Sequence, residues 1–169
     1  MCIWHLYVSG IRCADLRFTP GGVLHAPLDP ETAVLAPFQP LSTEAAAGYL
    51  ALTHFDLEAL AGRMAEYERL FPGPPEVETS WGARYLSDDG VRWAQREIKY
   101  PWNVTVSGGR LAAFTCPSRE RVHVLVREGC EDATVLARWR AYRPEPILPV
   151  RRVENLEVPM RDGVHLSTD

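Results

Sequence analysis

No stretch of this sequence is apolar over the roughly 20 residues that a helix needs to cross a bilayer. The opening residues also lack the basic segment followed by an apolar segment that marks a secretory signal, because Ser9 and Gly10 interrupt the first apolar residues. We therefore expect a cytoplasmic protein with no membrane partner.

Closely spaced metal ligands are also missing. No two of the four cysteines form a Cys-x-x-Cys pair, and a cytosolic chain keeps its thiols reduced. These cysteines are Cys2, Cys13, Cys116 and Cys130. The five histidines do not pair with the thiols at the spacing of a zinc site; they are His5, His25, His54, His123 and His165. We predict no metal, no cofactor and no catalytic residue in this chain.

An excess of positive charge is absent. The 18 basic and 22 acidic residues give a formal charge of −4 and are dispersed along the chain, so nucleic acid is not an expected partner. Six arginines gather late in the sequence among acidic neighbours, which favours a solvated strand face over an anion site. They are Arg119, Arg121, Arg127, Arg138, Arg140 and Arg143.

The residues that are present predict two helices. With 46% hydrophobic and 24% charged residues, the balance is that of an ordinary globular protein. Helix formers fill residues 43–52 after a hydroxyl at the cap, and residues 57–70 repeat apolar side chains at three- and four-residue steps behind Asp56 as N-cap. We expect this apolar stripe to pack on a sheet; the alternative is a partner or homo-oligomer face.

Strand patterns surround the helical region. The first forty residues are interrupted by prolines, which suits short strands, beginning with residues 1–8. Residues 103–107, 110–114 and 122–126 predict three antiparallel strands, the first two joined by Gly108-Gly109. For residues 131–142 both helix and strand stay open, with a weak preference for helix.

The end of the sequence predicts a linker and a hairpin. Three prolines in residues 143–149 favour an extended linker, which we place at residues 143–154. Residues 155–169 alternate apolar and polar side chains on both sides of Asp162-Gly163, a dipeptide typical of a two-residue hairpin loop.

The phrase Glu157-Val-Pro-Met-Arg-Asp-Gly-Val-His-Leu-Ser-Thr-Asp169 resembles the first hairpin of the cocaine-esterase-like and Xaa-Pro dipeptidyl-peptidase family of serine α/β-hydrolases. The resemblance implies that a catalytic domain with a Ser-His-Asp triad lies downstream. No Gly-x-Ser-x-Gly elbow occurs in the 169 residues. We therefore expect an accessory region of an acyl esterase or Xaa-Pro peptidase, inactive alone, whose partner is the downstream hydrolase domain.

Two residues are candidate nucleophiles. Cys2 would become an N-terminal thiol beside its own amine if Met1 were removed, as in N-terminal-nucleophile amidohydrolases, but the expected supporting residues are not recognisable. Ser118 follows a proline and is better explained as a turn residue. Five tryptophans are expected in the core or an interface more than around a ligand; they are Trp4, Trp81, Trp93, Trp102 and Trp139.

Together these patterns predict an α+β fold, an antiparallel sheet with one or two packed helices. The expected divisions are an accessory domain over residues 1–142, a proline-rich linker over 143–154, and the first hairpin of an incomplete α/β-hydrolase domain over 155–169. The competing interpretation is a stand-alone binding or interaction module without enzymatic activity.

Overall fold

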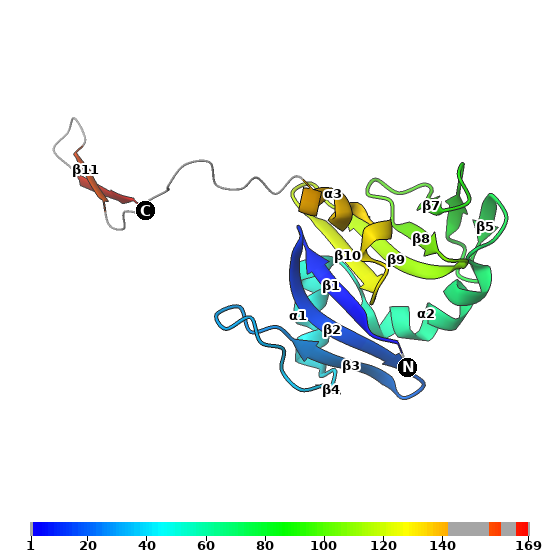
Figure 1. Ribbon diagram of the computed structural model, residues 1–169, viewed down its shortest axis with the longest axis horizontal. Helices are drawn as coiled ribbons and strands as arrows, with labels where there is room; N and C mark the ends of the chain where they lie inside the picture. The colour runs from blue at the N-terminus through cyan, green and yellow to red at the C-terminus, as the bar shows by residue number, and fades with distance from the viewer. Residues whose placement is uncertain (1, 142–155, 160–164, 169) are drawn as a thin grey trace.

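The computed structural model describes residues 2–141, 156–159 and 165–168. Its main feature is a ten-stranded, wholly antiparallel sheet with the strand order β4-β3-β2-β1-β10-β9-β8-β7-β6-β5 (Figure 1). The strands of the amino-terminal half are β1 (Trp4–Val8), β2 (Ile11–Thr19), β3 (Gly22–Pro27) and β4 (Gln39–Pro40). Those of the second half are β5 (Glu76–Glu78), β6 (Arg84–Leu86), β7 (Arg92–Gln95), β8 (Asn103–Ser107), β9 (Arg110–Pro117) and β10 (Val122–Arg127).

The sheet is built from two meanders that join at its centre. Strands β1 to β4 run outward in one direction, and β10 back to β5 in the other, so that β1 pairs with β10. Leu6 lies opposite Leu125 at this junction. The first and last strands of this sheet in chain order therefore lie side by side at its centre.

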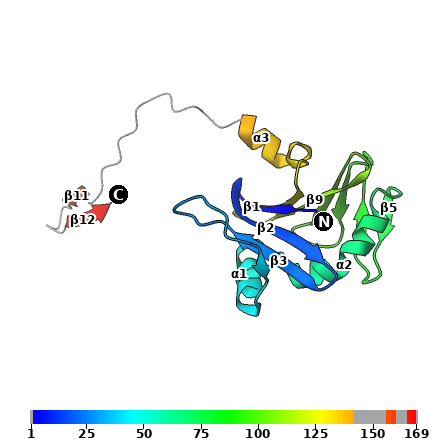
Figure 2. The same cartoon turned by 60° about the horizontal axis from the view of Figure 1, so that its bottom comes forward.

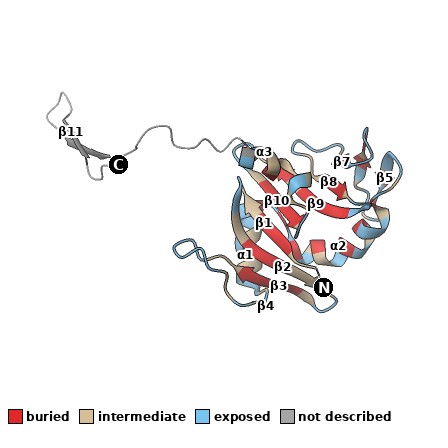
Figure 3. Ribbon diagram, in the orientation of Figure 1, coloured by how far each residue is buried: buried red, intermediate tan, exposed pale blue. Residues whose placement is uncertain are grey.

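Helices cover both faces of the central strands. Helices α1 (Thr43–Thr53) and α2 (Leu57–Leu70) connect the two meanders and lie on one side, while the short helix η1 (Glu131–Ala133) and α3 (Val135–Ala141) lie on the other (Figure 2). In β10, Leu125 belongs to the core under α2, whereas Val124 and Val126 pack with Leu136 of α3. Because side chains alternate along a strand, β10 is buried on both faces (Figure 3).

Both predicted helices are confirmed, including their caps. The Ser42 side chain accepts a hydrogen bond from the Ala45 N–H, and the Asp56 carboxylate accepts one from the Ala59 N–H. The apolar stripe of α2 packs in the chain's own core, since Leu57, Leu60 and Met64 are all buried. None of the described helices is both long and apolar enough to span a membrane.

The antiparallel α+β prediction is confirmed, but the sheet is larger than three strands. Gly108 and Gly109 both have positive φ, 57° and 71°, as the tight β8–β9 turn requires. The segment between α2 and β8, for which the sequence predicts no strand, contributes β6 and β7. These strands have three and four residues and mixed polarity, so they give little periodic signal.

Residues 131–141 form η1 and α3, which resolves the open choice in favour of helix. The predicted linker, residues 143–154, lies outside the described residues. Beyond it, β11 (Leu156–Pro159) and β12 (His165–Thr168) pair antiparallel as a separate two-stranded sheet. No parallel sheet of the α/β-hydrolase kind occurs among the described residues.

Candidate functional site

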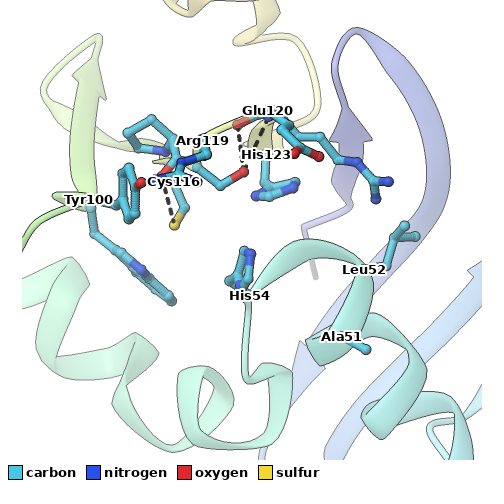
Figure 4. Close-up of a pocket in the computed structure, with 12 residues that line it drawn as sticks. Ala51, Leu52, His54, Tyr100, Cys116, Arg119, Glu120 and His123 are labelled. Carbon is cyan, nitrogen blue, oxygen red and sulfur yellow. Dashed lines mark hydrogen bonds between the residues drawn. The ribbon is translucent and has the colours of Figure 1, made fainter.

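A cavity of about 480 Å³ lies between the end of α1 and the turn that joins β9 to β10 (Figure 4). This volume is within the range of small-molecule sites in proteins. Its lining comes from the end of α1, the segment before β8, and the β9–β10 hairpin. The lining residues are Ala51, Leu52, His54, Tyr100, Trp102, Cys116, Pro117, Ser118, Arg119, Glu120, Arg121 and His123.

His54 is presented to the cavity by the end of α1. It is the C-cap residue, with a left-handed φ of 59°, and its backbone N–H donates to the carbonyl of Leu50. Histidine is one of the few residue types besides glycine that are enriched in this conformation. The backbone hydrogen bond thus fixes the position of the His54 Cα atom, from which the side chain projects. The His54 and His123 rings lie edge-to-face, with a centroid distance of 5.3 Å and an angle of 61° between their planes.

His123 and Cys116 are direct cross-strand partners on β10 and β9. Directly opposite residues of an antiparallel pair project from the same face, so the imidazole and the thiol both point to the side of α1. Figure 4 shows the rings of His54 and His123 turned toward each other with the Cys116 thiol beside them. The register of β9 against β10 and the C-cap of α1 together bring His54, Cys116 and His123 into one group.

The His123 ring is buried without a hydrogen bond. Only 1% of the residue is exposed, and neither ring nitrogen has a hydrogen-bond partner among the described residues. Burial lowers the pKa of His123 below its usual value, and the neighbouring His54 adds to this effect. The nearby Cys116 backbone acts in the opposite direction, because it favours the charged form of the ring. His123 is therefore a neutral imidazole at neutral pH.

Cys116 is equally unsuited to carry charge. Burial raises the pKa of its thiol to about 11, and the Trp102 side chain opposes this only in part. A nucleophilic cysteine needs the thiolate, which a neighbouring imidazolium normally stabilises. Here burial keeps both the thiol and the His123 imidazole neutral, so the pair is not poised for nucleophilic catalysis.

Aromatic side chains form one wall of the cavity. Trp102 is held by an edge-to-face contact with Phe55, at a centroid distance of 5.0 Å, and Phe55 is fully buried. Tyr100 lies at the opening with 37% of its surface exposed. The charged residues Arg119, Glu120 and Arg121 are exposed and line the β9–β10 turn. The site thus combines an aromatic wall, a charged rim and a neutral polar interior.

A second polar cluster lies on the opposite face of the sheet. The His5 Nδ1 and Asp15 Oδ1 atoms are 2.8 Å apart, and the His5 Nε2 atom is 3.4 Å from Glu131 Oε1. The Arg12 guanidinium also donates to Asp15, through Nε at 2.9 Å. Since these charged groups pair with one another and Glu131 belongs to η1, we interpret the cluster as a structural link between β1, β2 and η1.

The two candidate nucleophiles, Cys2 and Ser118, both make local contacts with backbone groups. The Cys2 thiol contacts the carbonyl of Ile3 at 3.6 Å. The Ser118 hydroxyl donates to the Arg121 carbonyl at 3.1 Å and accepts from the Arg121 N–H at 3.2 Å, which confirms its assignment as a turn residue.

The tryptophan prediction is confirmed, with one addition. Trp4 and Trp93 are buried in the core, and Trp81, Trp102 and Trp139 pack against it. Trp102 also lines the cavity. Two of the late arginines have acidic partners, since Arg127 pairs with Glu68 at 2.7 Å and Arg140 with Asp132 at 3.2 Å.

The grouping of His54, Cys116 and His123 was missed by the sequence analysis. A signal for two of them exists, because closing the β9–β10 hairpin around residues 118–121 places Cys116 opposite His123. Nothing local connects His54 to either. In the described part of the chain, no three histidine, cysteine or acidic side chains are arranged to hold a metal ion.

Comparison with known proteins adds no relative: no family model, no curated protein and no solved structure matches this chain.

Proposed function

We propose that this chain is the accessory region of a serine hydrolase of the cocaine-esterase-like and Xaa-Pro dipeptidyl-peptidase class, and that it lacks the catalytic core. The observation that carries the proposal is the phrase from Glu157 to Asp169, which resembles the opening hairpin of that family's catalytic domain. In this proposal residues 1–142 are the accessory domain, 143–154 the linker and 155–169 the first hairpin.

The pairing of β11 with β12 supports this assignment of the phrase. Val158 lies opposite Leu166, and Pro159 opposite His165. A regular two-residue loop at Asp162-Gly163 would instead place Pro159 opposite Leu166, so the observed register differs by one residue from that expectation. The loop itself, residues 160–164, lies outside the described residues. The arms are nevertheless the ones that the sequence pattern predicts.

The chemistry of the described domain supports inactivity in isolation. The nucleophile elbow of an α/β-hydrolase requires a strand-to-helix turn with closely spaced glycines, and the sequence has no Gly-x-Ser-x-Gly. The one thiol in the main cavity, Cys116, has a pKa raised to about 11 by burial. An ester or amide would therefore meet no activated nucleophile there.

Ester turnover tests this proposal directly. The purified 169-residue chain is incubated with p-nitrophenyl acetate and p-nitrophenyl butyrate, with and without a serine-directed phosphonate. We expect no turnover above the buffer rate and no covalent phosphonate adduct by intact mass. Turnover that the phosphonate abolishes would refute an inactive accessory region.

The coding sequence beyond the codon for Asp169 tests the second part of the proposal, that a hydrolase domain follows this chain. We expect it to continue into strands and a Gly-x-Ser-x-Gly elbow, followed by an Asp and a His. A reading frame that continues without these elements would contradict the hydrolase assignment.

A binding module is the second candidate function, and one observation favours it. The cavity of about 480 Å³ between α1 and the β9–β10 hairpin is within the size range of small-molecule sites, and Trp102 lines it. Saturable ligand binding in the absence of any downstream hydrolase sequence would select this candidate. The two functions are compatible if the hydrolase sequence is found.

A further inference from the structure

We propose that a second cavity, between α3 and the strands β7 to β9, binds a small hydroxylated oxyanion of the class of a sugar phosphate or a sugar acid. In this proposal Arg92 and Arg138 bind the anionic group, and polar side chains of the sheet bind the hydroxyl groups. The inference does not depend on the hydrolase proposal, because it uses only residues of the described domain.

This second cavity, called the α3 cavity below, has a volume of about 420 Å³. It lies on the face of the sheet that η1 and α3 cover, away from the cavity beside His54. The volume is sufficient for one ligand of the size of a monosaccharide. The lining residues are Arg92, Asn103, Thr105, Thr115, Asp132, Ala133, Thr134, Val135, Ala137 and Arg138.

The floor of the α3 cavity comes from three neighbouring strands whose register places polar side chains together. Thr105 of β8 lies opposite Arg92 of β7, and Asn103 of β8 lies opposite Thr115 of β9. Directly opposite residues project from the same face, and so do residues two positions apart in one strand. Thr115 is also opposite Val124, which packs under α3. All four polar side chains therefore project toward α3.

The hydroxyl of Thr105 is open to the α3 cavity although the residue is buried. Only 3% of Thr105 is exposed, and the structure shows no hydrogen bond from its hydroxyl to another described residue. Unlike the ring nitrogens of His123, this oxygen is not sealed from solvent, so a ligand in the α3 cavity can reach it. A hydroxyl both donates and accepts hydrogen bonds, which suits a hydroxyl group of a ligand.

Two arginines from different elements meet at the α3 cavity. Arg92 of β7 and Arg138 of α3 are both exposed, so a ligand can reach them, and neither forms an ion pair with an acidic side chain of the described residues. Arg140 differs from them, because it pairs with Asp132 at 3.2 Å. A guanidinium group has a planar set of donors that matches the oxygens of a carboxylate or a phosphate.

The charges around the α3 cavity favour an anion. Its one acidic lining residue, Asp132, already has Arg140 as a partner, so the two remaining guanidinium groups leave the lining positive. The Asp89 carboxylate, close to Arg92 in sequence, accepts from the backbone N–H groups of Val91 and Arg92. A purely apolar ligand would remove these charged and polar groups from water without replacing their hydrogen bonds.

The uncharged polar residues favour hydroxyl groups on the rest of the ligand. The Asn103 side-chain amide donates to the Pro101 carbonyl at 3.3 Å, which leaves its oxygen as an acceptor. Thr105 and Thr115 add two hydroxyls on the same face. A polyol that carries one anionic group therefore matches both parts of the lining.

Glucose-6-phosphate, gluconate and glucose form a matched set of probes, because they have similar hydroxyl groups and differ in charge. We expect the full chain to bind at least one of the two anions saturably, and about tenfold more tightly than glucose. Chemical-shift titration by NMR gives the dissociation constants and shows whether residues of β8 and α3 respond. Tighter binding of glucose-6-phosphate identifies a phosphate site, and tighter binding of gluconate identifies a carboxylate site.

The Arg138→Gln variant tests the role of the guanidinium. We expect its affinity for the preferred anion to fall by about tenfold while its affinity for glucose stays the same. Arg92→Gln should behave in the same way. Arg110→Gln is the matched control, since Arg110 is also an exposed arginine but does not line the α3 cavity. This control removes the same charge from the protein and should leave the affinity for the anion unchanged.

The Thr105→Val variant tests the hydroxyl without a large change of shape. We expect the affinity for the preferred anion to fall by about fivefold, with a melting temperature at least as high as that of the wild type. Absence of saturable binding of both anions to the wild-type chain would overturn the proposal. So would equal affinity for glucose and the preferred anion, or the same loss of affinity in Arg138→Gln and Arg110→Gln.

Discussion

The hydroxyl groups of Tyr67 and Tyr85 lie 3.1 Å apart in the interior, where they form a hydrogen bond between α2 and β6. Only 3% and 1% of the two residues is exposed. Burial raises the pKa of both hydroxyls, so each remains protonated. This bond connects the helix between the two meanders to a short strand near the sheet edge, within an aromatic cluster in which Phe71 also contacts both tyrosine rings.

Replacement of Tyr85 by Phe should therefore destabilise the protein by about 1–2 kcal/mol, because the Tyr67 hydroxyl is left buried without a partner. Urea denaturation measures the change. The double variant Tyr67→Phe/Tyr85→Phe should be less destabilised than the sum of the two single variants, since no hydroxyl then remains unpaired. Strict additivity would show that the two groups are not coupled.

The helices illustrate how much of the fold the sequence predicts. Asp56 followed by apolar residues at three- and four-residue steps is a local signal, and α2 begins and ends where that signal says. The strands β8 to β10 were predictable for the same reason, since runs of β-prone residues lie on both sides of turns that contain glycine or proline. Strand β6 has only three residues, and its pairing with β5 and β7 depends on neighbours that a local pattern does not contain.

The candidate site was not predictable because its residues come from distant elements. His54 lies at the end of α1 and His123 in β10, and their 5.3 Å approach depends on how α1 sits on the sheet. The same holds for His5 and Glu131, which meet only because η1 lies over β1. Both groups therefore depend on the tertiary arrangement of the helices on the sheet, which the local secondary-structure propensity of the sequence does not contain.

The buried cluster of His5, Asp15 and Arg12 should contribute more to stability than an exposed ion pair. Asp15→Asn removes the charge that both His5 and Arg12 contact, and we expect a loss of about 3 kcal/mol in the free energy of unfolding. The Asp15 side chain is 6% exposed.

The exposed pair Glu76 and Arg84 is the control for the buried cluster. Its atoms approach to 2.6 Å, but the Glu76 side chain is 57% exposed, so Glu76→Gln should change stability by less than about 1 kcal/mol. Urea denaturation of both variants at neutral pH makes the comparison. Equal effects would contradict a structural role for the His5 cluster.

Because the Cys116 thiol is buried, we expect the free energy of unfolding to decrease at alkaline pH. The pKa of the thiol is about 11 in the folded protein and near the usual 9 in the unfolded chain. Below pH 9 the thiol is protonated in both states and does not affect the pH dependence. As the pH rises from about 9 to about 11, the unfolded chain loses its proton first, so the unfolded state is favoured.

The variant Cys116→Ala isolates this contribution from those of the buried tyrosines. We expect the free energy of unfolding to fall less steeply between pH 9 and 11 in Cys116→Ala than in the wild type. Chemical denaturation across that range is the measurement, with Cys2→Ala as a control in a half-buried thiol outside the cavity. Parallel curves for wild type and Cys116→Ala would show that the thiol is not buried as described.

Because the His123 ring is buried, we expect the free energy of unfolding to decrease at acidic pH as well. Burial lowers the pKa of the ring below the usual 6.5, so the unfolded chain takes up a proton before the folded protein does. The stability contributed by the neutral ring is fully present above about pH 6.5 and is lost as the pH falls toward the folded pKa. His123→Leu should flatten this acid dependence and, at pH 7.5, be at least as stable as the wild type, because no unpaired ring is then buried. Urea denaturation at pH 7.5 and 5.5 measures both effects. A variant that is destabilised at pH 7.5 and retains the full acid dependence would mean that the imidazole has a structural partner and does not cause the acid dependence.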